Sequence, residues 1–152
     1  MVPSEETPPA NPWRAQHSTR FRVRYSETDQ MGTFYNSRAL EWFECGRTEL
    51  MRHLGLPYSV MEARGVFLPV VEAHVEYLGR ARYDDWLEMT TSAEMLGRAK
   101  LRSEVIINQV ETNVPVARGY TIHAFVDPHG KVVRPPPWFL AVVDPNRPTL
   151  GV

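Results

Sequence analysis

The stretch Arg24–Arg52, RYSETDQMGTFYNSRALEWFECGRTELMR, joins the end of a predicted strand to the only long helix that the sequence predicts. Between residues 21 and 25, large apolar side chains alternate with polar ones, which is the period of a half-buried strand. That strand would deliver Glu27 and Asp29 to its end. Gly32 then permits the tight turn that folds the chain back toward the helix. The sequence therefore predicts a carboxylate near the start of a helix.

Residues 37–54 have the apolar period of a helix of about five turns. Asn36 is a favoured N-cap residue, and Gly55 followed by Pro57 is a favoured helix stop. Both ends of the helix are therefore well marked. Its apolar face is predicted to contain Leu40, Phe43, Arg47, Leu50 and Leu54.

The remainder of the chain is predicted to be rich in strands. A short helical segment is expected at 58–64, and Pro69 and Pro115 should lie at strand starts or edges because proline lacks a backbone donor. One long helix with about five antiparallel strands predicts an α+β fold in which a curved sheet wraps the helix. Unpaired sheet edges favour a symmetric dimer. The later strands are expected at 66–78, 86–96, 100–110 and 114–126.

Length and composition indicate one globular domain. The 152 residues are 43% hydrophobic and 23% charged, and no apolar run approaches the roughly 18 residues of a membrane span. With 17 basic and 18 acidic residues, the chain has no overall positive electrostatic field that would attract nucleic acid or an anionic membrane. A single cysteine and no secretory signal pattern favour a cytoplasmic protein. We expect a flexible tail at 1–19, a folded domain at 20–140 and a second tail at 141–152.

The predicted arrangement of Asp29 and the helix suits acyl transfer. The first turn of a helix offers unpaired N–H groups and roughly half a positive charge to an oxygen that becomes negative during the reaction. Asp29 could act as a general base on water, or attack the carbonyl to form an anhydride. Its residue pattern alone equally suits a turn-capping aspartate.

The stretch RYSETDQMGTFYNSRALEWFECGRTELMR resembles the signature of the 4-hydroxybenzoyl-CoA thioesterase branch of the hotdog-fold acyl-CoA thioesterases. VVEAHVEYLGRARYDDWLEMTT and GYTIHAFVDPHGKVVRPP also resemble strands of that family, so the similarity covers residues 20–137. The resemblance implies a hotdog fold, hydrolysis of an acyl thioester to acid and CoA, no cofactor, and an active site shared across a homodimer. It also implies that dimers pair into tetramers.

The resemblance assigns roles to individual residues. Asp29 matches the catalytic aspartate, and the backbone N–H of Asn36 matches the donor to the thioester carbonyl. Many relatives have histidine or tyrosine at position 36, so asparagine there is a departure that leaves the backbone donor intact. Tyr35 is expected to line the acyl pocket, and Gly32 is also expected to bind substrate. Three basic residues are expected near the nucleotide of CoA: Arg98, Lys100 and Arg134.

Other side chains in the stretch have competing interpretations. Glu27 could pair with Asp29 as acid and base, or be a surface charge at a strand end. Glu41 and Glu44 could be catalytic, as in another hotdog branch, or form helical ion pairs. Cys45 and His53 lie about 12 Å apart along one helix, too far to form a nucleophile and base. The histidines show no spacing typical of metal ligands, so no metal is expected.

Two other functions remain open. The chain could be a hotdog protein that binds an acyl thioester or small ligand without turnover, or a dehydratase for carrier-bound hydroxyacyl chains. Dehydration usually uses a histidine and carboxylate pair, and position 36 is asparagine. The sequence leaves open the acyl group, CoA versus acyl carrier protein, and base versus nucleophile.

Overall fold

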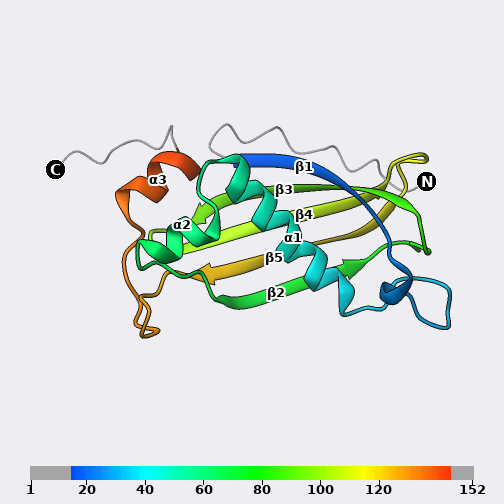
Figure 1. Cartoon of the computed structure of the whole chain (residues 1–152), viewed down its shortest axis with the longest axis horizontal. Helices are drawn as coiled ribbons and strands as arrows, with labels where there is room; N and C mark the ends of the chain where they lie inside the picture. The colour runs from blue at the N-terminus through cyan, green and yellow to red at the C-terminus, as the bar shows by residue number, and fades with distance from the viewer. Residues whose placement is uncertain (1–14, 145–152) are drawn as a thin grey trace.

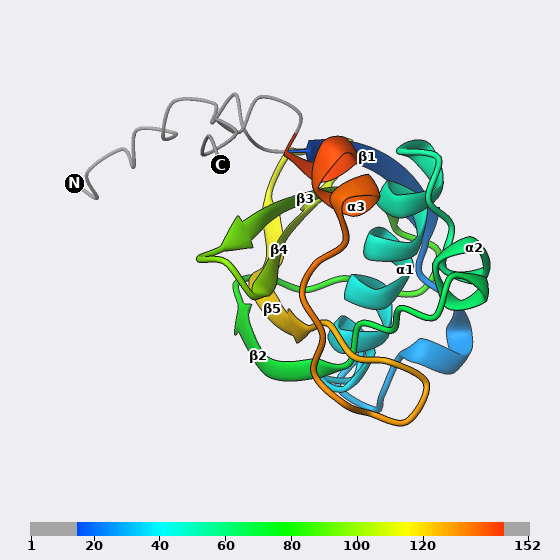
Figure 2. The same ribbon diagram turned by 90° about the vertical axis from the view of Figure 1, so that its left-hand side faces the viewer.

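The structure, a computed structural model, describes residues 15–144 and contains one five-stranded antiparallel sheet. The strand order is β1-β3-β4-β5-β2, so β3, β4 and β5 form a central meander and β1 and β2 are its edges. Figure 1 shows α1 crossing the sheet, and Figure 2 shows the sheet curving around this helix. The strands are β1 (Ala15–Arg22), β2 (Val70–Tyr77), β3 (Trp86–Leu96), β4 (Lys100–Gln109) and β5 (Pro115–Ala124).

Within residues 15–144, three α-helices accompany the sheet. The long helix α1 spans Arg38–His53, and the short helices are α2 (Tyr58–Ala63) and α3 (Pro137–Val143). The predicted stop of α1 is confirmed, because Gly55 has a φ of +80°, which glycine adopts without steric cost. The N-cap prediction was wrong by one residue, since the N-cap is Ser37 and its side chain makes no capping hydrogen bond.

Two predicted boundaries of the folded region were also wrong. β1 begins at Ala15, inside the expected tail, because its residues pair with β3 from Ala15↔Ala93 to Arg22↔Trp86. At the other end, α3 continues to Val143, whereas a tail was expected from residue 141. Phe139 and Val143 are fully buried, so their packing orders this helix. Residues 1–14 and 145–152 of the expected tails lie outside the described part of the chain.

The buried stripe of α1 differs by one position from the predicted face. Leu40 is 44% exposed, whereas its neighbour Ala39 is fully buried. Gly46 lies in the stripe, where an added Cβ would collide with the hydroxyl of Thr91 on β3. The helix therefore approaches the sheet closely near its middle. The buried residues are Ala39, Trp42, Phe43, Gly46, Arg47, Leu50 and Met51.

The core consists of two apolar clusters with polar side chains between them. Along β3, Met89 belongs to one cluster and Ala93 to the other, and buried Thr91 lies between them. On β4, buried Ser103 lies between Val105 and Leu101 of the two clusters and pairs with Ala93 of β3, so it is diagonal to Thr91. We call the band of buried polar side chains between the two clusters the polar layer. It contains Arg47 on α1 and Thr91, Ser103, Thr121 and His123 on the sheet.

Candidate active site

The sequence predicted that the strand before Asp29 would extend to this residue, but the loop that carries Asp29 does not continue β1. The chain leaves β1 at Arg22 and forms a 3₁₀ turn at Tyr25–Glu27 before Asp29. Asp29 N donates to the carbonyl of Thr33 at 3.0 Å, and Gly32 N donates to the carbonyl of Asp29 at 3.0 Å. Gly32 has a φ of +76°, as expected for the residue that permits this turn. A tight, internally bonded loop therefore positions Asp29.

The carboxylate of Asp29 is exposed and has one partner among residues 15–144. Its Oδ1 accepts a hydrogen bond of 2.8 Å from Met31 N, which is the bond that a turn-capping aspartate makes. The other oxygen, Oδ2, has no hydrogen-bond partner in this part of the chain. One oxygen therefore holds the loop, and the other is available to a ligand.

Asp29 lies beside the start of α1 in a cavity of about 200 Å³. The cavity also contains Tyr35 and Asn36, so the structure brings three predicted site residues together. Tyr77 and Arg80 are further members that the sequence did not single out, because alternation predicts a strand without saying which loop its end will meet. The lining residues are Asp29, Thr33, Phe34, Tyr35, Asn36, Tyr77, Gly79 and Arg80.

The backbone just before α1 has an unpaired donor on Asn36, one of the residues that line this cavity. Among residues 15–144, the N–H of Asn36 has no hydrogen-bond acceptor. The carbonyl of Asn36 is fixed by the hydroxyl of Tyr77, which donates to it at 2.7 Å. The N-terminal turn of α1 thus offers an unpaired amide beside a carboxylate.

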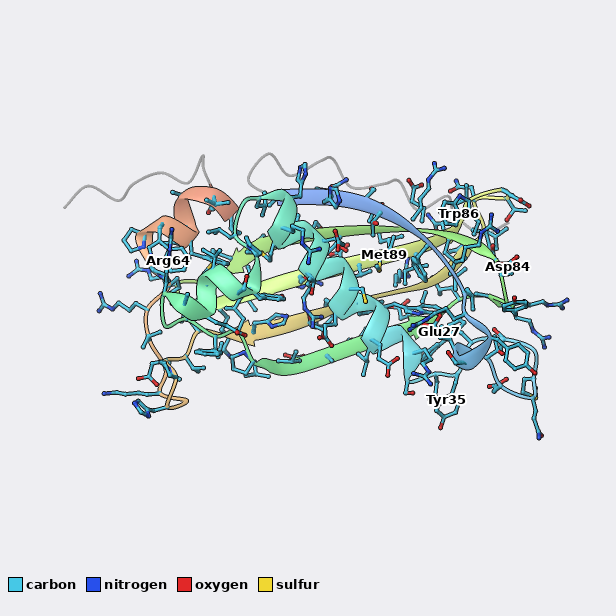
Figure 3. The ribbon with its side chains drawn as sticks, viewed as in Figure 1. Glu27, Tyr35, Arg64, Asp84, Trp86 and Met89 are labelled. Atoms are coloured by element: carbon cyan, nitrogen blue, oxygen red, sulfur yellow. The ribbon has the colours of Figure 1, made fainter. Side chains whose placement is uncertain are left out.

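Glu27 is neither a surface charge nor a side chain available to share a proton with substrate. It is 3% exposed, its Oε2 accepts from Trp42 Nε1 at 2.6 Å, and its Oε1 accepts from Arg24 N at 2.7 Å. Burial alone would raise the pKa of Glu27, but the hydrogen bonds from Arg24 and Trp42 outweigh it and lower that pKa. The backbone carbonyl of Glu27 accepts from Tyr35 N at 2.8 Å. Glu27 therefore ties the Asp29 loop to α1, and Figure 3 shows Glu27 and Tyr35 at this end of the helix.

The two helical glutamates behave differently. Glu41 pairs with Arg38 at 2.8 Å, as the helical spacing predicted. Glu44 makes no ion pair with Arg47, because Arg47 turns beneath the helix to Thr121 while Glu44 stays exposed. Cys45 is an exposed free thiol, and burial of part of its surface raises its pKa.

The three basic residues expected near CoA do not meet Asp29 within one chain. Arg98 lies in the β3–β4 turn and Lys100 begins β4, whereas the Asp29 loop follows the end of β1 that pairs with Trp86 at the start of β3. Arg134 precedes α3, which lies at the same end of the sheet as the β3–β4 turn (Figure 1). All three are exposed, at the end of the sheet away from Asp29.

A second cavity, of about 530 Å³, lies beside the polar layer. Arg47 Nη1 donates to Thr121 Oγ1 at 3.2 Å, and Thr121 Oγ1 lies 2.8 Å from His123 Nε2. His123 Nδ1 lies 3.0 Å from the carbonyl of Leu68. With a proton on Nδ1, His123 donates to Leu68 and accepts from Thr121 through Nε2, so each of these hydrogen bonds has one donor and one acceptor. Burial lowers the pKa of His123 to about 4, and the Arg47 charge acts in the same direction. Apart from the helical spacing of Arg47, no pattern in the sequence predicted this network.

None of the helices within residues 15–144 is long and apolar enough to cross a membrane. Over the same residues, no group of three or more histidine, cysteine or acidic side chains could hold a metal ion.

Comparison with known proteins identifies the family. A family model described as the thioesterase-like superfamily matches residues 23–143. The chain is 44% identical over 72 residues to "Putative acyl-CoA thioesterase YneP" of Bacillus subtilis (strain 168), a match to 43% of this chain and 52% of that protein. It is 33% identical over 124 residues to a "Putative esterase" of Aquifex aeolicus (strain VF5), covering 82% of this chain and 94% of that protein.

Solved structures support the fold. A complex of a 4-hydroxybenzoyl-CoA thioesterase with 4-hydroxybenzoyl-CoA superimposes with a TM-score of 0.77 over 86% of this chain and 99% of that chain. At 16% identity, this likeness concerns the fold alone. The family match, the relatives and the five-stranded sheet curved around α1 agree with one another: the chain belongs to the thioesterase-like superfamily and has the hotdog fold implied by its sequence.

Proposed function

We propose that this member of the thioesterase-like superfamily hydrolyses acyl-CoA thioesters, with Asp29 as general base or nucleophile and the Asn36 N–H as carbonyl donor. One observation carries the proposal: a carboxylate with a free oxygen and an unpaired helix N-terminal amide line the same cavity. The name of the Bacillus relative points to the same substrate class.

The chemistry follows from the charges that develop. The thioester oxygen accepts from the Asn36 amide, which stabilises the negative charge of the tetrahedral intermediate; such a donor typically contributes on the order of 100- to 1000-fold in rate. In one route, Asp29 removes a proton from water, the water oxygen bonds to the carbonyl carbon, and the C–S bond breaks. The CoA thiolate takes up the proton that Asp29 had removed. In the other route, the Asp29 oxygen attacks the carbon, the C–S bond breaks, and the CoA thiolate takes up a proton from water. The remaining hydroxide then opens the anhydride, which releases the acid and restores the Asp29 carboxylate.

We further propose a dimer formed through β2, the edge strand whose end carries Tyr77. Antiparallel pairing of two copies of β2 would place the Asp29 cavity of one protomer beside the far end of its partner's sheet, which is the end that contains the β3–β4 turn. Arg98, Lys100 and Arg134 lie at that far end, where they could reach the nucleotide of CoA bound to the partner. Pairing of dimers into tetramers and a cytoplasmic location also belong to this proposal, which requires no cofactor.

The test is release of free CoA thiol from a panel of acyl-CoAs, measured with a thiol reagent. Asp29→Asn should reduce kcat by at least about 100-fold while substrate binding and folding are retained. Asp85→Asn is the matched control, because Asp85 caps another turn by accepting from Arg82 N through its Oδ2 and lies outside both cavities. Near-wild-type turnover by Asp29→Asn would refute the mechanism. Binding without thiol release would favour a binding protein, and an enoyl product would favour a dehydratase.

A further inference from the structure

Arg47 is a buried cation with an incomplete set of partners. It is 9% exposed, and it donates from Nη1 to Thr121. Its Nε has no hydrogen-bond acceptor, and no carboxylate lies within salt-bridge distance of it, among residues 15–144. Buried charged donors normally have partners, because leaving one unpaired is costly. Arg47 lines the 530 Å³ cavity, so a ligand there could supply the missing acceptor.

The cavity's surroundings restrict the chemistry of that ligand. Three carboxylates, those of Glu44, Glu62 and Asp127, line it against the single positive charge of Arg47. His123 is neutral at physiological pH, since its pKa is lowered to about 4. An anionic ligand would therefore be repelled by the rim, whereas an uncharged oxygen could accept from Arg47 without that penalty. Much of the remaining wall is apolar and consists of Phe67, Leu68, Pro69, Val70 and Val126.

The edge strand β2 relates this cavity to the Asp29 cavity. Val70 begins β2 and lines the larger cavity, and Tyr77 ends β2 and lines the smaller one. If two copies of β2 pair antiparallel about a twofold axis, Val70 of one copy lies beside Tyr77 of the other. The Asp29 cavity of one protomer then faces the Arg47 cavity of its partner. The two cavities are separate within one chain, but the dimer brings the cavity of one protomer next to the other cavity of its partner.

We propose that the partner's Arg47 donates a hydrogen bond from Nε to a hydroxyl or carbonyl oxygen on an uncharged acyl group whose thioester lies at Asp29. This inference rests on the proposed function and its β2 dimer, and it adds the substrate class. Acyl groups with an uncharged oxygen are preferred over plain hydrocarbon chains, and both are preferred over acyl groups ending in a carboxylate.

The test uses acyl-CoAs whose acyl groups have four to ten carbons. Each length is tested in three forms: the plain hydrocarbon, the ω-hydroxy form and the ω-carboxy form. At the length that reaches Arg47, kcat/KM for the hydroxy form should exceed that for the plain form by about tenfold or more. Arg47→Met should bring this ratio close to one, whatever its activity on the plain form. An unchanged ratio in Arg47→Met, or no hydroxy preference at any length, would overturn the proposal. If Arg47→Met does not fold, Arg47→Lys should also lower the ratio, because its ammonium cannot reproduce the Nε position.

A subunit-mixing experiment tests whether the site is shared. Asp29→Asn and Arg47→Met chains are unfolded together and refolded in equal amounts, so that about half of the dimers are hybrids. Each hybrid has one site with both Asp29 and the partner's Arg47 intact, so hydroxyacyl-CoA turnover should recover to about a quarter of the wild-type value. No recovery above the separately refolded parents would show that Arg47 acts on its own chain's Asp29 or on neither.

Binding separates failure of this proposal from failure of the proposed function. Calorimetry with Asp29→Asn measures whether the ω-hydroxyacyl-CoA binds more tightly than the plain acyl-CoA, and whether Arg47→Met removes the difference. If wild-type protein releases no thiol yet shows this Arg47-dependent preference, the hydrolase proposal fails and the oxygen site stands. If it releases thiol without the preference, the oxygen site fails and the hydrolase proposal stands.

Discussion

The hydrogen bond between Glu27 and Trp42 is a buried contact whose loss should be measurable. Trp42→Phe removes the Nε1 donor and leaves a carboxylate that is 3% exposed with one fewer partner. We expect the free energy of unfolding to fall by about 1–3 kcal/mol, measured by urea denaturation. Glu41→Gln is the control, because it weakens the Arg38–Glu41 pair on the exposed side of the same helix and should cost less than about 1 kcal/mol. Equal losses in both variants would contradict the role given to Glu27.

The neutral state of His123 should make stability depend on pH. Its pKa is about 4 in the folded protein and 6.5 in the unfolded chain, so the unfolded chain binds more protons between these values. The stabilisation is complete above pH 6.5 and decreases as the pH falls toward 4, by up to about 3 kcal/mol.

Urea titrations across this pH range measure the effect. His123→Gln removes the titrating group, so its unfolding free energy should change less over the same interval, even if the variant is less stable throughout. Wild-type stability that is flat between pH 6.5 and 4, or a slope unchanged in His123→Gln, would contradict this account.

Helix α1 contains a position where packing should override helix propensity. In an exposed helix, Gly→Ala stabilises by about 1 kcal/mol. At Gly46 the new Cβ would collide with the Thr91 hydroxyl and press on Met89, so Gly46→Ala should instead destabilise by about 1–3 kcal/mol in urea unfolding. Thr91→Ser, which keeps the hydroxyl, should not relieve the collision, whereas Thr91→Ala should. Stabilisation by Gly46→Ala alone would show that α1 does not approach β3 this closely.

The elements that sequence analysis predicted well are those with a strong local period. β3 was predicted at 86–96 and is found at Trp86–Leu96, and α1 differs from its predicted bounds by one residue at each end. The errors arose where tertiary contacts decide. Leu40 has the right spacing for the buried face but points away from the sheet, and α3 depends on burial of Phe139 and Val143 after a proline-rich segment.

The candidate site was predicted in part, for a related reason. Asp29 and Asn36 are close in sequence, so one loop and one helix start were enough to place them together. Tyr77 and Arg80 reach the same cavity from the end of β2, and Glu27 became buried only because Trp42 lies on the facing side of α1. Contacts over such distances along the chain depend on the registers of strands and helix, which local patterns do not encode.

At the scale of the whole molecule, the proposed dimer predicts that activity depends on the β2 edge. Ala73 lies near the middle of β2 and is exposed, so in a twofold pairing it would lie close to its own copy. Ala73→Lys should place two like charges together and shift the protein toward monomer in sedimentation velocity, with reduced thiol release. Thr90→Lys, on central strand β3, is the control and should keep the dimer. A monomeric wild-type protein would contradict the proposed interface.

The polar layer divides the interior into two compartments that are each closed by their own apolar side chains. One compartment holds α1 as far as Phe43 against the sheet near the Asp29 loop, and the other holds the last turns of α1 with α2 and α3. Opening the second compartment breaks few contacts in the first. Slowly exchanging amides should therefore fall into two groups with separate opening free energies, and the group around Trp42 and Phe43 should remain protected when the C-terminal half loosens.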